Sequence, residues 1–480
     1  MRPTRRLDLR IARRAGSRRI GIGRPESDAA ERATPHAQDT RNTRASHLRA
    51  FPAIFTHMPS ATTPVNDAAS LGQRAIGRRL LPLAAGAIAL LTLTPAGDGS
   101  SAALPSLWCL RCGDFGAVDV VLNVMLFMPL GLALGLMGVP ARRIVLAALL
   151  TSICVEAVQL AVIAGRDASL SDVLTNTTGG ALGALIALQW RRLVLPAPPD
   201  ARTFLALFLL AWTATRIGTA WLLRPSFPET VWYGQLAPRD VYPADFRGEL
   251  IHADIGGVAV RTGQMPELRN ALRVPSFGVR ALIGSAERAL RLASVISVLD
   301  EHRTEVLLLG QEGTAARFRV RLRSADARFR TPSVILDSAL LTDAHGPTEL
   351  TGFWSPGRLS LASTAAGRSR GAAVGLGPGL GWALLLPFDT GLTPVIAEAG
   401  TAALVATAVL FVGYFAGMSI PGRTVAAISL ALALAIAGLW FPAIVFPEAT
   451  VSASEALTAA LGAIAGVLSA KSVCRLRQAT

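Results

Sequence analysis

Cysteine, lysine and charged residues in general are scarce in this chain of 480 residues. Its 4 Cys are too few for a disulfide-rich secreted scaffold. Charged residues make up only 16% of the sequence, whereas an ordinary soluble domain carries about 25%. Apolar residues account for 51% and the mean hydropathy is +0.44. These proportions exclude a disordered chain and indicate that much of the protein lies in lipid.

The net charge of +15 is high enough for a nucleic-acid-binding protein, but its make-up argues against one. Of the 47 basic residues only Lys471 is a lysine, and such a bias is more typical of codon composition than of a selected surface. Residues 1–57 hold 13 Arg against 5 acidic residues and no sustained apolar period, so they cannot bury enough surface to order themselves. Two interpretations stay open: a basic tail that meets nucleic acid or anionic lipid, and misread sequence upstream of a true start at Met58. We expect no nucleic-acid partner.

Eight apolar runs are long enough, or nearly so, to cross a bilayer core that needs about 20 helical residues. They lie near residues 79–95, 117–138, 141–163, 171–189, 202–223, 397–418, 424–446 and 452–470. Basic residues in the short connections fall on alternate sides, and the positive-inside rule then places both termini in the cytoplasm. The sequence therefore predicts an α-helical polytopic protein of the bacterial plasma membrane, with about eight transmembrane helices.

Domain boundaries follow from the changes in composition. We expect a basic tail over 1–78, a five-helix membrane module over 79–223, an extracytoplasmic β-sandwich domain with its linker over 224–396, three transmembrane helices over 397–470 and a cytoplasmic tail over 471–480.

Acidic and amide side chains gather inside the apolar runs between residues 114 and 183. They form pairs three or four residues apart: Asp119 with Asn123, Glu156 with Gln159, and Asp172 with Asn176. On helices each pair shares one face. Ionisable groups at membrane depth cost about 2.5–3.5 kcal/mol each, so they normally face a bundle interior or a cavity. The pattern predicts one shared polar cluster, with Arg166 as the cationic partner of Glu156 or Asp172.

The motifs of this segment are L-N-V-M-L-F-M-P-L-G, E-x-x-Q and R-x-x-S-x-x-D-x-x-x-N-x-x-G-G. Together they resemble the VanZ-like family of small bacterial membrane proteins, over about residues 80–190. The resemblance implies a membrane module of four or five helices. It also suggests a link with glycopeptide tolerance, because one member is associated with teicoplanin resistance, although the family has no settled mechanism. The family's motif positions carry over to Asn123, Phe127, Pro129, Gly131, Glu156, Gln159, Arg166, Asp172 and Asn176.

The polar cluster has two interpretations. Buried amides and acids often join membrane helices, at about 0.6 kcal/mol for each hydrogen bond, and Gly179, Gly180 and Gly183 would allow close helix approach. Alternatively, Glu156 and Asp172 serve a membrane-embedded enzyme that acts on a lipid-linked substrate, or a proton-coupled transporter. The chain has no H-E-x-x-H, no G-x-S-x-G and no His in any apolar run. We therefore favour a protein without catalysis, cofactor or metal.

Two smaller motifs carry weaker expectations. Cys109 and Cys112 lie in the first outer loop, where the oxidising side of the membrane favours a local disulfide over two free thiols. The run G-L-G-P-G-L-G at 375–381 lacks the G-K-[ST] of a phosphate loop and is typical of a flexible linker.

Residues 225–390 contain short stretches of strand period separated by E-G-T, D-A-H-G and S-P-G turns. The stretch F-R-G-E-L-I-H-A-D-I and the later S-V-L-D and L-L-L-G-Q-E-G resemble laminin-G or concanavalin-like jelly rolls. That resemblance implies recognition of an envelope glycan or a peptidoglycan precursor. Candidate sugar-stacking aromatics are Trp232, Tyr233, Tyr242, Phe353 and Trp354.

An alternating stretch at 316–323 turns Phe318, Val320 and Leu322 one way and four arginines, at 317, 319, 321 and 323, the other. We expect these arginines to form a solvated sheet face, with an anionic polymer as the alternative partner. The lipid bilayer is the one partner that composition alone implies, and the oligomeric state stays open.

Overall fold

The computed structural model describes residues 65–94, 115–162, 169–340 and 346–479. All of them fall within one unit, Thr63–Thr480. Several expectations lie outside the described residues, namely the tail 1–57 with its start at Met58, the pair Cys109 and Cys112, and Arg166.

Seven described helices are long and apolar enough to cross a membrane, which fits a multi-pass membrane protein. They are α1 Val65–Leu93, α2 Gly116–Leu136, α3 Ala141–Val162, α6 Pro198–Leu222, α9 Pro394–Ser419, α10 Thr424–Val445 and α11 Ala453–Ala479. Each coincides with one of the eight predicted runs, although α1 begins well before the predicted run at 79.

The eighth predicted span is the helix α4, Leu170–Leu188, which is too polar for the group of seven. Its first half carries Asp172 and Asn176 among four hydroxyl-bearing residues. Even so, α4 runs parallel to α2: Asn123 of α2 contacts Asp172, and Gly135 of α2 lies against Ala184 and Ala187. Any membrane that α2 crosses is therefore crossed by α4 as well.

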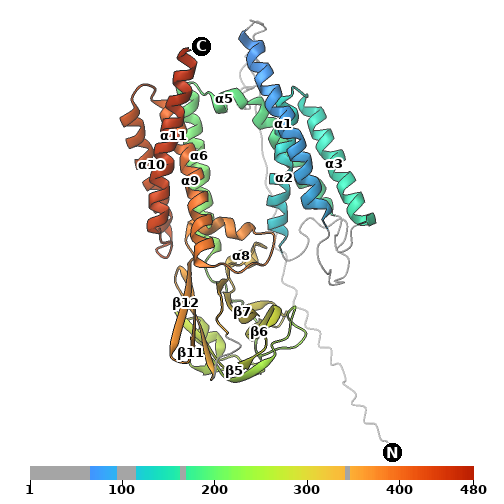
Figure 1. The fold of residues 1–480 in the computed structure, drawn as a ribbon, viewed down its shortest axis with the longest axis vertical. Helices are drawn as coiled ribbons and strands as arrows, with labels where there is room; N and C mark the ends of the chain where they lie inside the picture. Colours follow the sequence, from blue (N-terminus) through green and yellow to red (C-terminus); the bar gives the residue numbers. More distant parts are fainter. Residues whose placement is uncertain (1–64, 95–114, 163–168, 341–345, 480) are drawn as a thin grey trace, which may run out of the picture. The chain divides into compact units, whose positions relative to one another are not determined.

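Small residues set the contact between α2 and α4. A Cβ at Gly131 would overlap the carbonyl of Gly180, and a Cβ at Gly183 would overlap the carbonyl of Met128. Glycines spaced by four allow two helix backbones to touch, which lipid-embedded helices use in place of a hydrophobic driving force. The close approach predicted from the glycines of α4 is confirmed. Helix α3 packs on α4 and α1 on α2, which completes a four-helix group (Figure 1).

A second group consists of α6 with α9, α10 and α11, which lie side by side in Figure 1. Here α9 and α11 run parallel and share a glycine-lined contact, in which Gly413 faces the carbonyl of Ala463 and Gly466 faces that of Leu410. The short helix α5, Trp190–Val194, connects α4 to α6.

Between α6 and α9 the chain forms an all-β domain, as predicted. Its described strands make two antiparallel six-stranded sheets, in the orders β4-β1-β6-β7-β8-β9 and β12-β11-β10-β5-β2-β3. The strands are β1 Trp232–Leu236, β2 Gly248–Ile255, β3 Val258–Ala259, β4 Gly263–Gln264, β5 Phe277–Ala286, β6 Ala289–Asp300, β7 Glu305–Gly313, β8 Ala315–Val320, β9 Val334–Leu336, β10 Thr348–Ser355, β11 Arg358–Ala365 and β12 Arg368–Gly375. One apolar core takes side chains from both sheets, among them Trp232, Phe277, Leu307 and Phe318. The short helices α7 Leu268–Leu272 and α8 Arg323–Asp326 complete the domain.

The second sheet has one end next to the membrane helices and one end far from them. The turn between β10 and β11 holds Gly357 at a φ of +74°, where a Cβ would overlap the carbonyl of Glu448 in the α10–α11 connection. At the opposite end of β10, Thr348 pairs with Ile283 and Ala365. Seven residue steps separate the two ends, which at about 3.3 Å per residue is roughly 23 Å.

The prediction of a flexible linker at 375–381 is wrong. The segment leaves β12 and enters the 3₁₀ helix η1, Pro378–Leu385. Its glycines pack tightly: a Cβ would crowd Thr450 from position 377, Glu455 from position 379 and Thr219 from position 381. Glycine is needed at these positions because residues of α6, α11 and the α10–α11 connection lie directly against the backbone of this segment. A freely moving linker would not require glycine for that reason.

Candidate functional site

The predicted polar residues of α2, α3 and α4 meet around the first turn of α4. The hydroxyl of Ser169 accepts a hydrogen bond from the Asp172 amide at 3.1 Å and so caps this helix. The amide of Ser169 in turn donates to Glu156 Oε2 of α3 at 3.0 Å. Asn123 of α2 donates from Nδ2 to Asp172 Oδ1 at 2.6 Å. Three helices are therefore joined through side chains that the sequence singled out.

Two further contacts extend the cluster along α3. Asn176 Nδ2 donates to the hydroxyl of Ser152 at 3.0 Å, and Gln159 Nε2 donates to the carbonyl of Thr92 in α1 at 2.9 Å. Glu156, Gln159 and Asn176 are all buried. Among the described residues, Asn176 Oδ1 is the one side-chain atom of this cluster that is buried without a hydrogen-bond partner. These bonds show the helix-joining role directly, and a role in ligand binding or catalysis stays a prediction.

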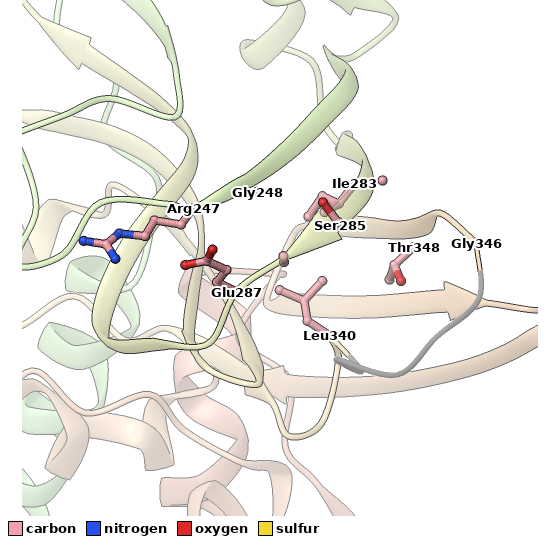
Figure 2. A pocket seen from close by; sticks show the side chains of 10 residues that line it. Arg247, Gly248, Ile283, Ser285, Glu287, Leu340, Gly346 and Thr348 are labelled. Atoms are coloured by element: carbon pink, nitrogen blue, oxygen red, sulfur yellow. The ribbon is translucent and has the colours of Figure 1, made fainter.

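The all-β domain carries a cleft at the end of the second sheet that lies far from the membrane helices. Figure 2 shows the side chains that line it. Its volume is about 420 Å³. The lining residues are Arg247, Gly248, Ile283, Gly284, Ser285, Ala286, Glu287, Leu340, Gly346 and Thr348. In Figure 2 the side chains of Arg247 and Glu287 lie toward one end of the cleft and Thr348 toward the other. The cleft therefore combines two opposite charges, two hydroxyl groups and a small apolar floor.

The predicted sugar-stacking aromatics do not form an exposed platform. Trp232 and Trp354 belong to the core, where the Trp354 ring stacks on Phe277 with centroids 5.6 Å apart. The Tyr242 hydroxyl donates to Glu305 Oε2 at 3.0 Å. Tyr233 is half-buried, and Phe353 is 42% exposed. Any glycan contact in this domain would rest on polar groups more than on ring stacking.

Comparison with known proteins bears on the membrane region. Residues 54–193 match the family model VanZ/LLP1. This chain carries a VanZ-like region. The match includes α1 to α4 and every residue of the predicted polar cluster, so the resemblance stated from the motifs is confirmed. No curated protein and no solved structure matches the chain.

Outside the VanZ-like region, sequence reasoning missed a buried ion pair. Arg216 of α6 and Glu455 of α11 are 3% and 4% exposed, and Arg216 Nη1 lies 3.5 Å from Glu455 Oε1. Arg216 also lies over the ring of Trp212 and donates from Nη2 to the carbonyl of Leu439 at 3.4 Å. A charged residue inside an apolar run was the signal that could have found them.

The prediction of a solvated arginine face on β8 is wrong. Arg317 is 1% exposed and reaches Asp389 at 2.7 Å and Glu312 at 3.3 Å. Arg319 pairs with Glu305 and Asp389 at 2.6 and 2.9 Å. Asp389 lies about 70 residues further along the chain, in the segment that returns from η1 toward α9. That segment covers the face, which strand periodicity alone could not reveal.

These contacts shift the ionisation of the groups involved. Burial by itself would raise the pKa of the Asp389 carboxyl, but the guanidinium groups of Arg319 and Arg317 hold that pKa below its ordinary value. Burial raises the pKa of the Tyr242 phenol, and the Glu305 carboxylate raises it further. Some of these residues line a second cavity of about 780 Å³. Two of its arginines, Arg319 and Arg321, are paired with carboxylates, and Arg330 donates to the carbonyls of Leu386 and Pro387.

Metal binding receives no support from the described ranges, within which no group of three or more His, Cys, Asp or Glu side chains is placed to hold an ion.

Proposed function

We propose that this VanZ-like protein belongs to the bacterial plasma membrane and that its all-β domain binds an envelope glycan outside the cytoplasm. The glycan would lie in the cleft around Arg247 and Glu287. The observation that carries the proposal is the position and chemistry of this cleft, at the end of the sheet farthest from the membrane helices.

Charge supports the placement of the domain outside the cytoplasm. Basic residues lie at one end of several helices or in the connections there: Arg142 and Arg143 in the first turn of α3, Arg191 and Arg192 in α5, and Arg423 just before α10. Arg78 and Arg79 lie within α1, before its most apolar part, and Lys471 lies in the last third of α11. Short basic loops stay in the cytoplasm. The all-β domain follows the other end of α6 and precedes the other end of α9, so the same rule places it on the opposite side.

The chemistry of the cleft supports a saccharide that carries a carboxylate. Its volume of about 420 Å³ falls in the usual range of about 300–1,000 Å³ for small-molecule sites. Arg247 can bind a carboxylate through two parallel hydrogen bonds. Glu287 and the hydroxyls of Ser285 and Thr348 offer partners for sugar hydroxyls, while Ile283 and Leu340 provide an apolar surface. Peptidoglycan fragments with a lactyl carboxylate combine these features.

Binding a peptidoglycan fragment or precursor near the membrane surface provides a route to glycopeptide tolerance, because those antibiotics act on the same material. We therefore propose that loss of the protein makes cells more sensitive to glycopeptides. Restoring the gene with Arg247→Ala would then fail to restore tolerance, while restoring the unchanged gene would succeed.

A binding measurement tests the glycan proposal directly. The full chain, purified in lipid nanodiscs, is titrated with a soluble disaccharide fragment of peptidoglycan by calorimetry. We expect Arg247→Ala to weaken binding about tenfold or more, since one charge-assisted pair contributes about 1.5–3 kcal/mol. Arg358→Ala is the matched control, because Arg358 is exposed at the other end of the same sheet. Equal affinity of all three proteins, or no binding by any, would contradict the proposal.

A further inference from the structure

The two helix groups have equivalent glycine contacts, and equivalent residues are separated by a nearly constant number of positions in the sequence. Gly131 and Gly135 of α2 correspond to Gly413 and Gly417 of α9, each 282 residues later. The groups that they face in α4, the Gly180 carbonyl and the Ala187 methyl, correspond to the Ala463 carbonyl and the Ala470 methyl in α11, each 283 residues later. Gly179 and Gly183 likewise recur as Gly462 and Gly466, on the matching carbonyls of α2 and α9.

The buried faces of α3 and α10 also agree residue by residue. The buried positions of α3 are 144, 148, 152, 155, 156 and 159, and those of α10 are 427, 431, 435, 438, 439 and 442. Every position of the second set lies 283 residues after its counterpart. Both helices therefore present the same stripe to their neighbours.

The beginnings of α4 and α11 share one set of hydrogen bonds. Ser169 accepts from the amide of Asp172, and Ser452 accepts from the amide of Glu455, both at 3.1 Å. One turn further, the Thr175 hydroxyl donates to the carbonyls of residues 171 and 172, and the Thr458 hydroxyl to those of 454 and 455. Asp172 and Glu455 thus occupy the same place in the two groups.

The first helices complete the match. Buried positions 77, 88 and 92 of α1 correspond to 201, 212 and 216 of α6, each 124 residues later. In this register Thr92 is the counterpart of Arg216. In the second group the all-β domain is inserted in the sequence between the first helix, α6, and the second helix, α9. In the first group the corresponding connection, between α1 and α2, is about 20 residues long.

We propose that α6 and α9–α11 are a second copy of the four-helix VanZ-like unit, and that this copy holds a primary ammonium group against Glu455. We name α1–α4 the first unit and α6 with α9–α11 the second unit. Proteins of 480 residues seldom repeat so long a set of buried positions by chance, because each helix pair would have to agree independently.

The second unit lacks the donor that serves the carboxylate in the first. Asn123, which donates to Asp172, corresponds to Val405 of α9. Arg216 approaches Glu455 from one side, but none of the described residues donates a hydrogen bond to Glu455 Oε1, a buried atom. This carboxylate lines a cavity of about 130 Å³. Gly379 packs closely against Oε1, because a Cβ at this position would overlap that oxygen.

The lining of that cavity favours an ammonium group. Its described residues offer the carboxylates of Glu398 and Glu455 and the hydroxyls of Thr401, Thr450 and Ser452. Arg216 lies 3.5 Å from Glu455 and offsets one of the two carboxylates, which leaves Glu398 as the second negative charge at the cavity. Thr401 lies one turn before Val405 on α9, so the cavity opens on the face where the first unit places the Asn123 amide. An N–H of the ligand takes the place of that amide. The ammonium group could come from a soluble amine or from an aminophospholipid headgroup.

The experiment uses the full chain in detergent and measures the melting temperature Tm with increasing methylammonium chloride. Tetramethylammonium chloride is the matched control, because it has the same charge and no N–H. We expect methylammonium to raise Tm to a plateau by about 3 °C or more, as a ligand of the folded state does, and tetramethylammonium to give no plateau. The sources are then separated in nanodiscs: a lipid source predicts a higher Tm with ethanolamine headgroups than with choline headgroups.

Val405→Asn tests the correspondence itself. The new amide should reach Glu455 as Asn123 reaches Asp172, so this variant should fold and lose the methylammonium response. Leu404→Asn places the same residue one position away, on an exposed face of α9, and should keep the response. Equal effects of the two salts would overturn the proposal and assign the cavity to water. A response that survives Val405→Asn would overturn it as well.

Discussion

The two four-helix units share a packing framework and differ in the polar groups mounted on it. At matching buried positions the first unit has Ser152, Glu156 and Gln159 on α3, and the second has Ala435, Leu439 and Pro442 on α10. The glycines between the parallel helices are nevertheless kept. The glycines that allow close helix contact and the polar residues of the buried faces thus occupy separate positions. The polar residues can therefore change while the glycine contacts are kept.

The two units also differ in the group that contacts the corresponding carboxylate, which is Asp172 in the first unit and Glu455 in the second. In the first unit an amide from the second helix donates to Asp172, and in the second unit a guanidinium from the first helix approaches Glu455. Removing the Asn123 amide takes one hydrogen bond from Asp172, which is only half-buried. Removing the Arg216 guanidinium leaves the buried Glu455 carboxylate without its counter-charge, which is far more costly. The comparison therefore predicts unequal effects at equivalent sites.

The largest effect is expected from breaking the charged pair. Arg216→Leu should lower the free energy of unfolding by about 3–5 kcal/mol, because Glu455 is left buried and unpaired. Replacing both residues, Arg216→Leu with Glu455→Leu, should recover most of this loss. Asn123→Leu in the first unit should cost only about 1–3 kcal/mol. Denaturant titrations of the four proteins in micelles measure the differences, and a double variant no better than the single one would contradict the comparison.

Overpacking the glycine contacts should affect both units alike. Gly183→Val and Gly466→Val each place a side chain against a backbone carbonyl of the parallel helix, at an expected cost of about 1–3 kcal/mol. Gly86→Val and Gly218→Val are the controls, since neither glycine has a neighbour within 4 Å of an added Cβ. Thermal unfolding in detergent should separate the pairs. A strong loss in one unit only would show that the shared framework has different importance in the two.

The smallest effect concerns a contact that one unit has and the other lacks. Asn176→Ala should cost about 1 kcal/mol, because the Ser152 hydroxyl loses its donor. Adding Ser152→Ala recreates the pair Ala435 and Ala459 of the second unit, both of which are buried. Stability should then return most of the way to that of the unchanged protein. If the two losses simply add, the alanine pair is not an adequate substitute in the first unit.

Much of the membrane region could be predicted from local pattern. Apolar runs marked the helices, because lipid demands that a crossing segment satisfy its own backbone. Polar pairs spaced by three or four residues marked the buried faces of α3 and α4, and the structure joins Asn123 with Asp172 as a shared cluster requires. The internal copy escaped notice because what the units share is mostly Gly, Ala, Ser and Leu, which are common in any membrane helix.

Other features depended on residues far apart in the sequence. The arginines of β8 alternate as an exposed face would, yet Asp389 and its segment cover them. Trp232 and Trp354 are residue types that suit a sugar platform, and the meeting of two sheets turned them into core. The ion pair of Arg216 and Glu455 joins helices whose positions only packing could decide.

By itself the sequence determined that the chain is a membrane protein, which segments form helices apolar enough to cross a membrane, where the all-β domain is inserted and that polar side chains of α2, α3 and α4 meet. Each of these follows from composition or from a period of a few residues. Only the tertiary structure decided that the arginine face is covered, where the domain has its cleft and that the second unit repeats the first. Those features arise from contacts across tens to hundreds of residues, and a local pattern carries no record of them.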